Sequence, residues 1–589
     1  MKPGEVLSQA LAEQVREWID HDPDPSTVQQ LTDQLAAAKA GDQVALRDLA
    51  EAFAGPLEFG TAGLRGRMGG GPGRMNRAVV IRAAAGLITY LRRYLAMAGA
   101  LDEASPPKVV IGYDGRHGSA EFAEDTAAVV VAAGGRALLM ETHCPTPLLA
   151  YAVRYLTADA GVMVTASHNP AQDNGYKVYL GGRLVEPEGN GVQIVPPADV
   201  DIAAAIAAAP PADQVPRARG WEIIGPDLAT EYLREAVAGL PTVTGAKDLR
   251  IVHTAMHGVG ARLALPALEQ AGFTDVHAVP EQRDPNPDFP TVAFPNPEEP
   301  GAIDLAIGLA GRVGADLVLA HDPDADRCAA AVYDPRAPRG GGWRMLTGDE
   351  VGSLLAEEAA KLWEGQAEAP DGVRPTLASS IVSSRLLWRI ARAHLLAYAK
   401  TLTGFKWIAR TPGLVFGYEE AIGYCTRPDM VRDKDGITAG LALARLAARA
   451  KAKDQSLIDL LDDLARQHGL HLTSQVAARL GDPRALTEVM AALRRKPPTH
   501  LGGVAVTKVT DLEHGTDGLP PTDGLAFALK DLSRVVIRPS GTEPKVKCYL
   551  EVILPVGPTA SFEDITALRR QGAAHLEAIG TSVRQLLER

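Results

Sequence analysis

A serine at the end of a predicted strand is the first residue of this chain that could carry chemistry. Ser167 follows the apolar run 161–164, which is typical of a buried strand, and Pro170 interrupts the strand pattern because proline has no amide donor. A hydroxyl at such a strand end is exposed at the edge of a sheet, where active-site loops gather. Serine is a weak nucleophile unless a base, a metal or nearby positive charge activates it, and His168 and Lys177 could help. A capped turn is the alternative interpretation of this loop.

Three carboxylates alternate along a second predicted loop, at Asp322, Asp324 and Asp326. The preceding run 316–320 is a predicted strand, so the loop lies at the carboxyl end of a sheet. Oxygen-only ligands suit a hard cation, and Mg²⁺ keeps positions open for substrate oxygens. An EF-hand is excluded because Tyr333 stands where that motif requires Glu. The pattern predicts a magnesium site, with a solvated acidic turn as the alternative.

A third loop has the residue types of a phosphate site. After the predicted strand 535–537, the chain reads Arg538, Pro539, Ser540, Gly541, Thr542 and, slightly later, Lys545. An arginine can bind a phosphate through two hydrogen bonds, while the two hydroxyls and the amides around Gly541 donate to the remaining oxygens. The chain has no Walker sequence, so this is not a P-loop nucleotide site. A plain turn after a strand is the alternative.

A fourth loop carries the adjacent carboxylates Glu419 and Glu420 between glycines. Two neighbouring carboxylates are costly to bury together, so at least one is expected to meet a cation or hydroxyl groups, and the vicinal hydroxyls of a sugar fit this demand. Lys406 and Lys434 are flanked by glycine-containing turns and could add positive charge, although a solvated surface lysine is the alternative for each.

The sequence His257-Gly258-Val259-Gly260 begins like a dinucleotide-binding loop but has Leu263 where the third glycine should stand. It is predicted to be a tight strand-to-helix turn, with nicotinamide binding as the alternative.

The elements that must position these loops alternate between strands and helices. Amphipathic helices are predicted from residue 8 to about 53, followed by strands near 109–114, 137–140 and 161–164 with helices between them. This rhythm indicates an α/β fold with largely parallel sheets. Stretches rich in Ala, Pro, Arg and Gly at 203–218 and 335–342 divide the chain. The predicted domains are 1–220, 221–340, 341–468 and 469–589, each with one of the four loops.

Composition narrows the class of protein. The chain has 589 residues and a formal net charge of −12, which argues against a nucleic-acid or membrane-surface binder. Its four cysteines are far apart and form no CxxC pair, so they are interpreted as reduced thiols. No apolar run approaches the roughly 20 residues of a membrane span. A cytoplasmic protein is expected.

The four loops occur in an order that resembles the α-D-phosphohexomutase superfamily, and the likeness extends from about Phe59 to Leu550. It is similar in particular to bacterial α-phosphoglucomutases and to phosphopentomutase-like members. The resemblance implies four domains around a central cleft, three of them similar α/β domains with mixed sheets and the last a smaller α+β domain. It further implies a phosphorylated Ser167 and one Mg²⁺ bound by Asp322, Asp324, Asp326 and an oxygen at Ser167.

The remaining site residues follow from the same resemblance. Arg65, Lys177 and His168 would flank the phosphoserine as catalytic residues, and Arg327 would orient the reacting group. Glu419 would contact sugar hydroxyls, with Thr403 and Gly404 lining the neighbouring loop. On the residue argument given above, Lys406, Glu420 and Lys434 are also expected to bind the substrate. Arg538, Ser540, Gly541, Thr542 and Lys545 would bind the phosphate that does not react. A sugar bisphosphate would act as activator, and a monomer or small homo-oligomer is expected.

The leading functional expectation is interconversion of glucose 1-phosphate and glucose 6-phosphate through a bisphosphorylated intermediate. One departure from the hexose pattern is Ala421, which follows the glutamate pair where hexose-specific members often have Ser. Phosphomannomutase and phosphopentomutase activities of the same mechanism are therefore alternatives. A metal-dependent sugar phosphatase and a catalytically silent sensor are the other classes.

Overall fold

The computed structural model describes residues 6–239, 243, 245–336, 341–368, 372–479, 483–516, 518–539 and 545–588. The chain divides into two compact units. Unit 1 comprises Met1–Thr242, Ala246–Cys328 and Arg427–Ala444, and unit 2 comprises Val243–Gly245, Ala329–Thr426 and Arg445–Arg589.

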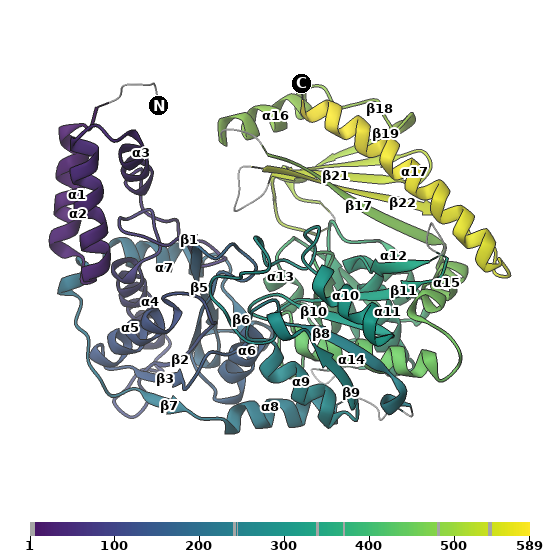
Figure 1. Ribbon diagram of the computed structural model, residues 1–589, viewed down its shortest axis with the longest axis horizontal. Helices are drawn as coiled ribbons and strands as arrows, with labels where there is room; N and C mark the ends of the chain where they lie inside the picture. The colour runs from purple at the N-terminus through teal and green to yellow at the C-terminus, as the bar shows by residue number, and fades with distance from the viewer. Residues whose placement is uncertain are drawn as a thin grey trace. The chain divides into compact units, whose positions relative to one another are not determined.

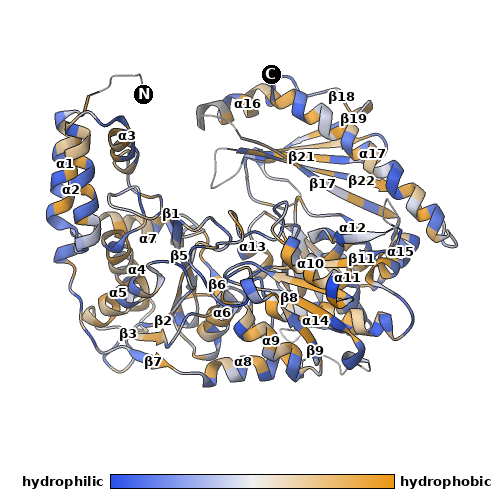
Figure 2. Ribbon diagram, viewed as in Figure 1, coloured by the Kyte–Doolittle hydropathy of each residue, from blue (hydrophilic) through white to orange (hydrophobic). Residues whose placement is uncertain are grey.

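The chain begins with the predicted amphipathic helices: α1 (Gln9–His21), α2 (Pro25–Lys39) and α3 (Gln43–Ala52). The side chains of Ser8, Asp24 and Asp42 accept hydrogen bonds from first-turn amides and so define where each helix starts. Hydrophilic and hydrophobic residues alternate along these helices (Figure 2), and their apolar sides form a small core of their own.

A seven-stranded mixed sheet follows, in the order β1-β5-β4-β2-β3-β7 with β6 paired to β5. Its strands are β1 (Leu64–Arg67), β2 (Lys108–Tyr113), β3 (Arg136–Met140), β4 (Ala160–Val164), β5 (Asp173–Leu180), β6 (Val192–Gln193) and β7 (Glu222–Ile224). The strands β2, β3, β4 and β7 are parallel, whereas β5 runs antiparallel to β4 and β1. The parallel strands β2 and β4 therefore end at the same edge, which positions the loops that follow them.

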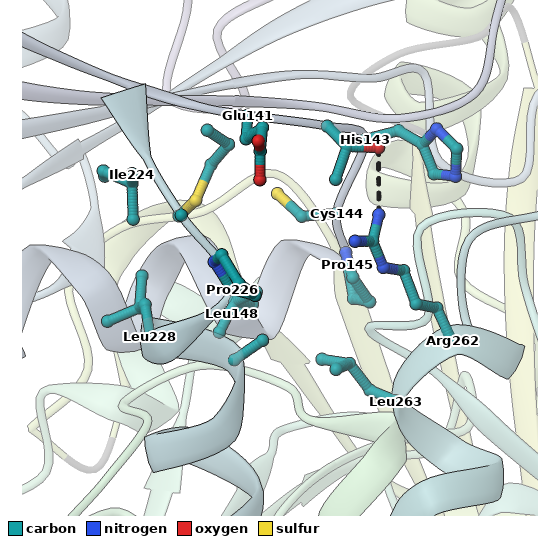
Figure 3. A pocket seen from close by; sticks show the side chains of 14 residues that line it. Glu141, His143, Cys144, Pro145, Leu148, Ile224, Pro226, Leu228, Arg262 and Leu263 are labelled. Atoms are coloured by element: carbon teal, nitrogen blue, oxygen red, sulfur yellow. Dashed lines mark hydrogen bonds between the residues drawn. The ribbon is translucent and has the colours of Figure 1, made fainter. Parts of the chain in front are cut away.

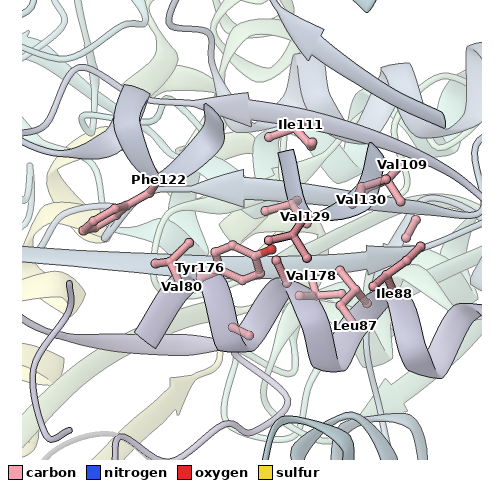
Figure 4. Packing of buried hydrophobic residues seen from close by; sticks show 14 of the residues in the cluster. Val80, Leu87, Ile88, Val109, Ile111, Phe122, Val129, Val130, Tyr176 and Val178 are labelled. Carbon is pink, nitrogen blue, oxygen red and sulfur yellow. The ribbon is translucent and has the colours of Figure 1, made fainter. Parts of the chain in front are cut away.

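Helices α4 (Arg77–Met97), α5 (Ser119–Ala132), α6 (Thr146–Tyr155) and α7 (Ala198–Ala207) accompany this sheet. Valine and isoleucine side chains of β2 pack against α4 and α5 around the buried ring of Tyr176 (Figure 4). The helix α6 contributes to a second apolar cluster. The first residues of the predicted linker 203–218 are helical and form the end of α7. The helix α7 packs on α4.

The rest of unit 1 contains the parallel strands β8 (Arg250–Thr254), β9 (Asp275–Ala278) and β10 (Leu317–His321). Its helices are α8 (Asp227–Ala238), α9 (Ala261–Gln270), α10 (Asp304–Val313) and the start of α14 (Gly436–Lys451). The strand β10 is fully buried. As predicted, it leads directly into the loop with Asp322, Asp324 and Asp326, here called the acidic loop.

Unit 2 contains β11 (Cys328–Asp334) antiparallel to β12 (Gly342–Met345) and a four-stranded sheet in the order β14-β13-β15-β16. The latter strands are β13 (Thr376–Ser380), β14 (Ala397–Thr401), β15 (Leu414–Glu419) and β16 (Gly423–Cys425), of which β16 alone is antiparallel to its neighbour. The accompanying helices are α11 (Gly348–Trp363), α12 (Leu386–Ala393), α13 (Phe405–Ala409) and α15 (Leu457–His468).

The last part of unit 2 is the expected smaller α+β domain. Its antiparallel sheet has the order β17-β22-β21-β20-β19-β18. The strands are β17 (Leu470–Arg479), β18 (His500–Leu501), β19 (Val504–Asp511), β20 (Leu525–Leu529), β21 (Arg534–Pro539) and β22 (Lys545–Leu554). Helices α16 (Pro483–Arg495) and α17 (Phe562–Leu587) belong to the same domain, and α17 packs along β17 and β22 (Figure 1).

The predicted fold class is confirmed: three domains have mixed α/β architecture and the fourth is an antiparallel sheet with helices. Within the described ranges, no helix has both the length and the apolar character needed to cross a bilayer. The four cysteines are buried free thiols.

Candidate active site

The loop after β4 holds Ser167 in a conformation that serine rarely adopts. Its φ is +53°, in the left-handed region, and its side chain is almost fully buried. Such strain in a residue other than glycine persists only when its surroundings impose it, and it is concentrated at functional sites. Thr165 contributes by accepting the amide hydrogen of Ser167 at 2.8 Å.

Arg116, which follows β2, binds the backbone of the loop that contains Ser167, here called the serine loop. Its buried guanidinium donates to the carbonyl oxygens of Ser167 at 2.6 Å and Pro170 at 2.7 Å, and also to that of Asn169. Asp114 accepts from Thr165 Oγ1 at 2.6 Å and lies 3.3 Å from the Arg116 guanidinium. The sequence shows Asp114 and Arg116 in a polar turn after a strand, but only the pairing of β2 with β4 reveals their role.

The hydroxyl of Ser167 faces the acidic loop. Its Oγ donates to Asp322 Oδ2 at 2.9 Å and lies 3.1 Å from His168 Nδ1. Burial, followed by the nearby charges of Arg327 and Arg65, lowers the pKa of His168 well below its ordinary value. His168 is therefore a neutral imidazole beside the serine.

The three aspartates of the acidic loop converge as predicted. They are buried, and one carboxylate oxygen from each lies within 4.8 Å of the others. Asp324 Oδ1 and Asp326 Oδ1 are buried acceptors that lack a hydrogen-bond partner among the described residues. Burial, then the charges of Asp324 and Asp326, raises the pKa of Asp322 well above its ordinary value. A hard divalent cation would satisfy these oxygens and relieve this repulsion, so the residues fit Mg²⁺.

The glycine motif 257–260 packs against this acidic loop. A Cβ at Gly258 would lie 2.2 Å from Pro323 Cα, and the amide of Val259 donates to the Pro323 carbonyl at 2.8 Å. The predicted tight turn is thus explained by the close approach of the acidic loop, which leaves no room for a side chain at Gly258.

Two lysines balance the carboxylates. Lys177, on β5, donates to Asp324 at 2.7 Å and Asp326 at 3.0 Å, and Lys434 lies 3.2 Å from Asp326. Burial opposes the charged form of Lys177, but the two aspartates outweigh it and raise its pKa. Burial likewise opposes ionisation of Asp326, yet Lys177, Lys434 and Arg327 lower its pKa. Lys177 therefore carries its proton in this state of the site.

Two arginines border the same cluster. Arg65, on β1, donates to Asn169 Oδ1 at 3.2 Å, because β1 pairs with β5 and places it beside the serine loop. The backbone amide of Arg327 donates to Asp322 Oδ1 at 3.0 Å, and its guanidinium lies 3.8 Å from Glu298. The structure thus brings together Ser167, His168, Lys177, Arg65, the three aspartates, Arg327 and Lys434.

Lys434 reaches this cluster on a segment whose placement the sequence did not indicate. The segment 427–436, here called the arm, packs with unit 1 although it follows the strands of the third predicted domain. Tyr179 donates to Asp433 at 2.9 Å, and Tyr232 donates to both oxygens of Asp435. Met430 belongs to an apolar cluster with residues of α6 and α8.

The predicted sugar-binding loop lies within unit 2. Gly404, at φ +103°, donates its amide hydrogen to Glu419 Oε1 at 2.7 Å. Glu420 Oε2 accepts from the hydroxyls of Ser380 at 3.0 Å and Ser383 at 2.8 Å. Glu420 thus meets the hydroxyls of the protein itself. Thr403 precedes this turn and Lys406 lies in the first turn of α13.

The predicted phosphate loop is only partly described. Arg538 lies near the end of β21 and donates a hydrogen bond to the hydroxyl of Tyr549, while Lys545 opens β22. Ser540, Gly541 and Thr542 lie outside the described residues.

A separate small pocket lies beside the β3–α6 connection (Figure 3). Its lining is largely apolar and includes Cys144, Leu148 and Leu228, with Arg262 donating to Thr142 at 2.9 Å. None of the predicted site residues lines this pocket.

Comparison with known proteins places this geometry in a family. Four consecutive regions match domains described as phosphoglucomutase/phosphomannomutase alpha/beta/alpha domain I (56–209), domain II (230–335), domain III (347–468) and C-terminal domain (476–553). A probable phosphomannomutase of Haemophilus influenzae is 43% identical over 81% of this chain and 93% of its own length. A probable phosphoribomutase of Schizosaccharomyces pombe is 36% identical over 92% and 93%, and a phosphoglucomutase of Staphylococcus epidermidis is 34% identical over 84% and 90%.

Solved structures agree at the level of the fold. Parafusin, a phosphoglucomutase from Paramecium crystallised in an open form, superposes with a TM-score of 0.64 at 18% identity, covering 90% of this chain and 96% of its own. A phosphoglucomutase/phosphomannomutase family protein from Burkholderia thailandensis gives 0.62 at 19% identity, covering 88% and 97%.

Proposed function

The chain belongs to the phosphoglucomutase/phosphomannomutase family of intramolecular phosphotransferases, and we propose that it moves a phosphoryl group between O1 and the terminal hydroxyl of an aldose phosphate through phospho-Ser167. One observation carries this proposal. The hydroxyl of a strained, buried serine lies 2.9 Å from Asp322, within a cluster of three carboxylates and two lysines. The two lysines, together with the divalent cation that the three carboxylates fit, would offset the negative charge of a phosphoryl group on that oxygen.

In the proposed reaction, phospho-Ser167 donates its phosphoryl group to the free hydroxyl of a sugar monophosphate. The Ser167 oxygen–phosphorus bond breaks and a sugar oxygen–phosphorus bond forms. Overall, the proton of the sugar hydroxyl ends on the released Ser167 oxygen, which restores the serine hydroxyl. The resulting bisphosphate turns around and returns its other phosphoryl group to Ser167. A sugar bisphosphate would activate an unphosphorylated enzyme by the same transfer.

One Mg²⁺ per chain, held by Asp322, Asp324, Asp326 and an oxygen at Ser167, would neutralise charge on the transferring group. Arg65 and Arg327 add positive charge beside the serine, and neutral His168 can exchange a hydrogen bond with its oxygen. Because Lys177 is protonated, we assign it to supplying a proton to a leaving oxygen, not to removing one from the sugar.

Substrate binding is assigned to the loops of unit 2 together with Lys434. Glu419, positioned by Gly404, would accept hydrogen bonds from sugar hydroxyls, with Thr403, Lys406 and Glu420 around it. Arg538 and Lys545, with Ser540, Gly541 and Thr542, would bind the phosphate that does not react. Such remote contacts orient the substrate without taking part in the chemistry.

Glucose 1-phosphate remains our first candidate substrate. A pentose 1-phosphate is the second, because Ala421 lacks the hydroxyl expected of hexose-specific members and several similar proteins are named phosphoribomutase or phosphopentomutase. Mannose 1-phosphate is the third, on the name of the Haemophilus relative.

The deciding experiment compares kcat/KM for glucose, mannose and ribose 1-phosphates with Mg²⁺ and the matching bisphosphate. A large advantage for one sugar identifies the substrate. Release of inorganic phosphate without isomerisation would replace the mutase by a phosphatase. Absence of both activities, with sugar-phosphate binding retained, would leave a sensor and contradict the proposal.

A further inference from the structure

Two buried histidines beneath the acidic loop are not used in the reaction proposed above. His253 lies on β8, and His321 is the last residue of the neighbouring parallel strand β10, immediately before Asp322. Both side chains are essentially inaccessible to solvent. His253 Nε2 lies 2.9 Å from His321 Nδ1, and His321 Nε2 lies 2.9 Å from the carbonyl oxygen of Gly436.

The carbonyl of Gly436 determines which ring nitrogens of the two histidines carry hydrogens. A backbone carbonyl can only accept, so His321 Nε2 must carry a hydrogen. The Nδ1 atom of a neutral His321 is then an acceptor, and His253 Nε2 must be the donor to it. His253 Nδ1 is left without a hydrogen, which agrees with its being buried and having no hydrogen-bond partner among the described residues.

The neutral state of both rings is favoured by their surroundings. Burial, followed by the neighbouring His321, lowers the pKa of His253 well below its ordinary value. His321 is equally buried, and its ring nitrogens face His253 and the Gly436 carbonyl, neither of which is a carboxylate that would stabilise a charged ring. The opposite proton order would direct the lone pair of His321 Nε2 at the Gly436 carbonyl, which would repel it.

Gly436, in the arm, contacts the backbone of the acidic loop. Its amide donates to the Ala325 carbonyl at 3.2 Å while its carbonyl accepts from His321. A Cβ at this position would lie 2.3 Å from the carbonyl oxygen of Arg327, so only glycine permits the contact. Two residues earlier, Lys434 directs its ammonium at Asp326.

We propose that His253 and His321 are both neutral and both protonated at Nε2, so that His253 donates to His321 and His321 donates to the carbonyl of Gly436. We further propose that this contact fixes the backbone at Gly436 and thereby the position of Lys434 beside Asp326. They are positioning residues and touch neither substrate nor metal. Their part in catalysis rests on the proposed function, because Lys434 is assigned there to the substrate. The proton order itself is a property of the protein alone and can be measured without turnover.

The first test is NMR of the full chain labelled with ¹⁵N in the histidine rings, with assignments from the variants His253→Phe and His321→Gln. We expect both histidines to give the signals of a neutral ring protonated at Nε2. In His253→Phe, His321 should stay protonated at Nε2, because the Gly436 carbonyl still accepts from it, but its Nδ1 signal should shift because that nitrogen loses its donor. A wild-type His321 protonated at Nδ1 would overturn the proposal.

The second test is kinetic, with the preferred sugar 1-phosphate. His253→Phe should lower kcat/KM by about ten-fold, the scale of one lost hydrogen bond, and His253→Gln should recover much of it because the amide can donate to His321. The matched control is His277→Phe on the adjacent strand β9, where the ring pairs with Asp275 away from the acidic loop. This control should retain wild-type kinetics.

A double-mutant cycle separates positioning from general damage to the fold. If His253 acts through Lys434, His253→Phe should cost nothing further in a Lys434→Met background. An equal cost in both backgrounds would contradict the proposal, as would a His253→Phe enzyme indistinguishable from wild type. If the wild type proves to have no mutase activity, the proposed function fails, and the NMR measurement still decides the proton order.

Discussion

At the scale of single residues, the reactive centre combines groups that would repel or destabilise one another elsewhere. Ser167 adopts a left-handed backbone, and three carboxylates are buried within 4.8 Å of one another. Lys177 and Lys434 offset part of the negative charge. In the proposed function, this arrangement would serve to stabilise the phosphoryl group on Ser167.

The substitution Ser167→Ala should abolish isomerisation, because it removes the oxygen that would carry the phosphoryl group. Sugar-phosphate binding should change little, since the assigned phosphate and sugar contacts lie in the loops of unit 2 and at Lys434, not at Ser167. Turnover and incorporation of ³²P from a labelled sugar bisphosphate measure the first effect, and calorimetric binding measures the second. Full activity in this variant would contradict the phosphoserine mechanism.

Removing one carboxylate of the acidic loop should weaken cation binding more than it weakens the fold. Asp324→Asn leaves an acceptor for Lys177 and Thr146 but removes one negative charge, so Mg²⁺ affinity should fall by about ten-fold or more. Titration of Mg²⁺ by calorimetry measures this without turnover. Asp288→Asn, whose exposed carboxylate pairs with His117, is the control and should leave Mg²⁺ affinity unchanged.

At the scale of secondary-structure elements, parallel strands bring the chemistry together. The strands β2 and β4 end side by side, so Arg116 can hold the carbonyls of the serine loop. The strand β10 delivers the acidic loop, and β5 returns antiparallel to β4 so that Lys177 faces it. Each loop is irregular, but each starts from a buried strand that fixes its origin.

Arg116→Met should test how far the serine loop depends on this support. The substitution keeps much of the aliphatic volume but leaves several buried carbonyls without a donor, so we expect about 3 kcal/mol of destabilisation. The activity should fall further than the loss of stability alone explains, because Arg116 would no longer hold the backbone of Ser167 in its left-handed conformation. Urea unfolding and kcat measured well below the unfolding midpoint separate the two effects. Unchanged kcat in a folded variant would contradict the positioning role of Arg116.

At the scale of the whole molecule, unit 2 has a buried polar junction of its own. Glu551, on β22, accepts from Ser384 Oγ at 2.9 Å and from the amide and guanidinium of Arg385 at 2.8 and 2.6 Å. His471 Nδ1 lies 3.1 Å away. These contacts join the smaller C-terminal domain to the segment before α12, which also supplies Ser383 to Glu420.

Glu551→Gln should destabilise unit 2 by roughly 3 kcal/mol at pH 7, because it replaces a buried carboxylate and leaves the half-buried Arg385 and Arg534 without their counter-charge. Burial opposes ionisation of Glu551, but Arg534, His471 and Arg385 outweigh it and lower its pKa. The stability that this carboxylate contributes is therefore present above its unfolded pKa and is lost as pH falls through its lower folded pKa. Denaturant unfolding from pH 7 downward should show the gap between wild type and variant closing in acid. Glu577→Gln, an exposed partner of Arg584, is the control and should show no such gap.

The sequence by itself determined in which type of fold the chain lies and which loops we expect to carry the chemistry. An apolar run that predicts a strand precedes each of these loops, which contain Ser167, the three aspartates, the glutamate pair and Arg538. Both this local pattern and the order of the loops can be read from the amino-acid sequence. The alternation of strands and helices likewise indicated the α/β class, because hydrophobic periodicity is a local property.

The tertiary structure alone decided what supports those loops. The packing of the arm against unit 1, the hold of Arg116 on the serine loop, and the contact of His253 with His321 all join residues that are distant in the chain. Such contacts leave no periodic signal, since they depend on strand order and on the burial that makes an unpaired polar group costly. The role of Glu420 is also tertiary, because Ser380 and Ser383 reach it from another strand end.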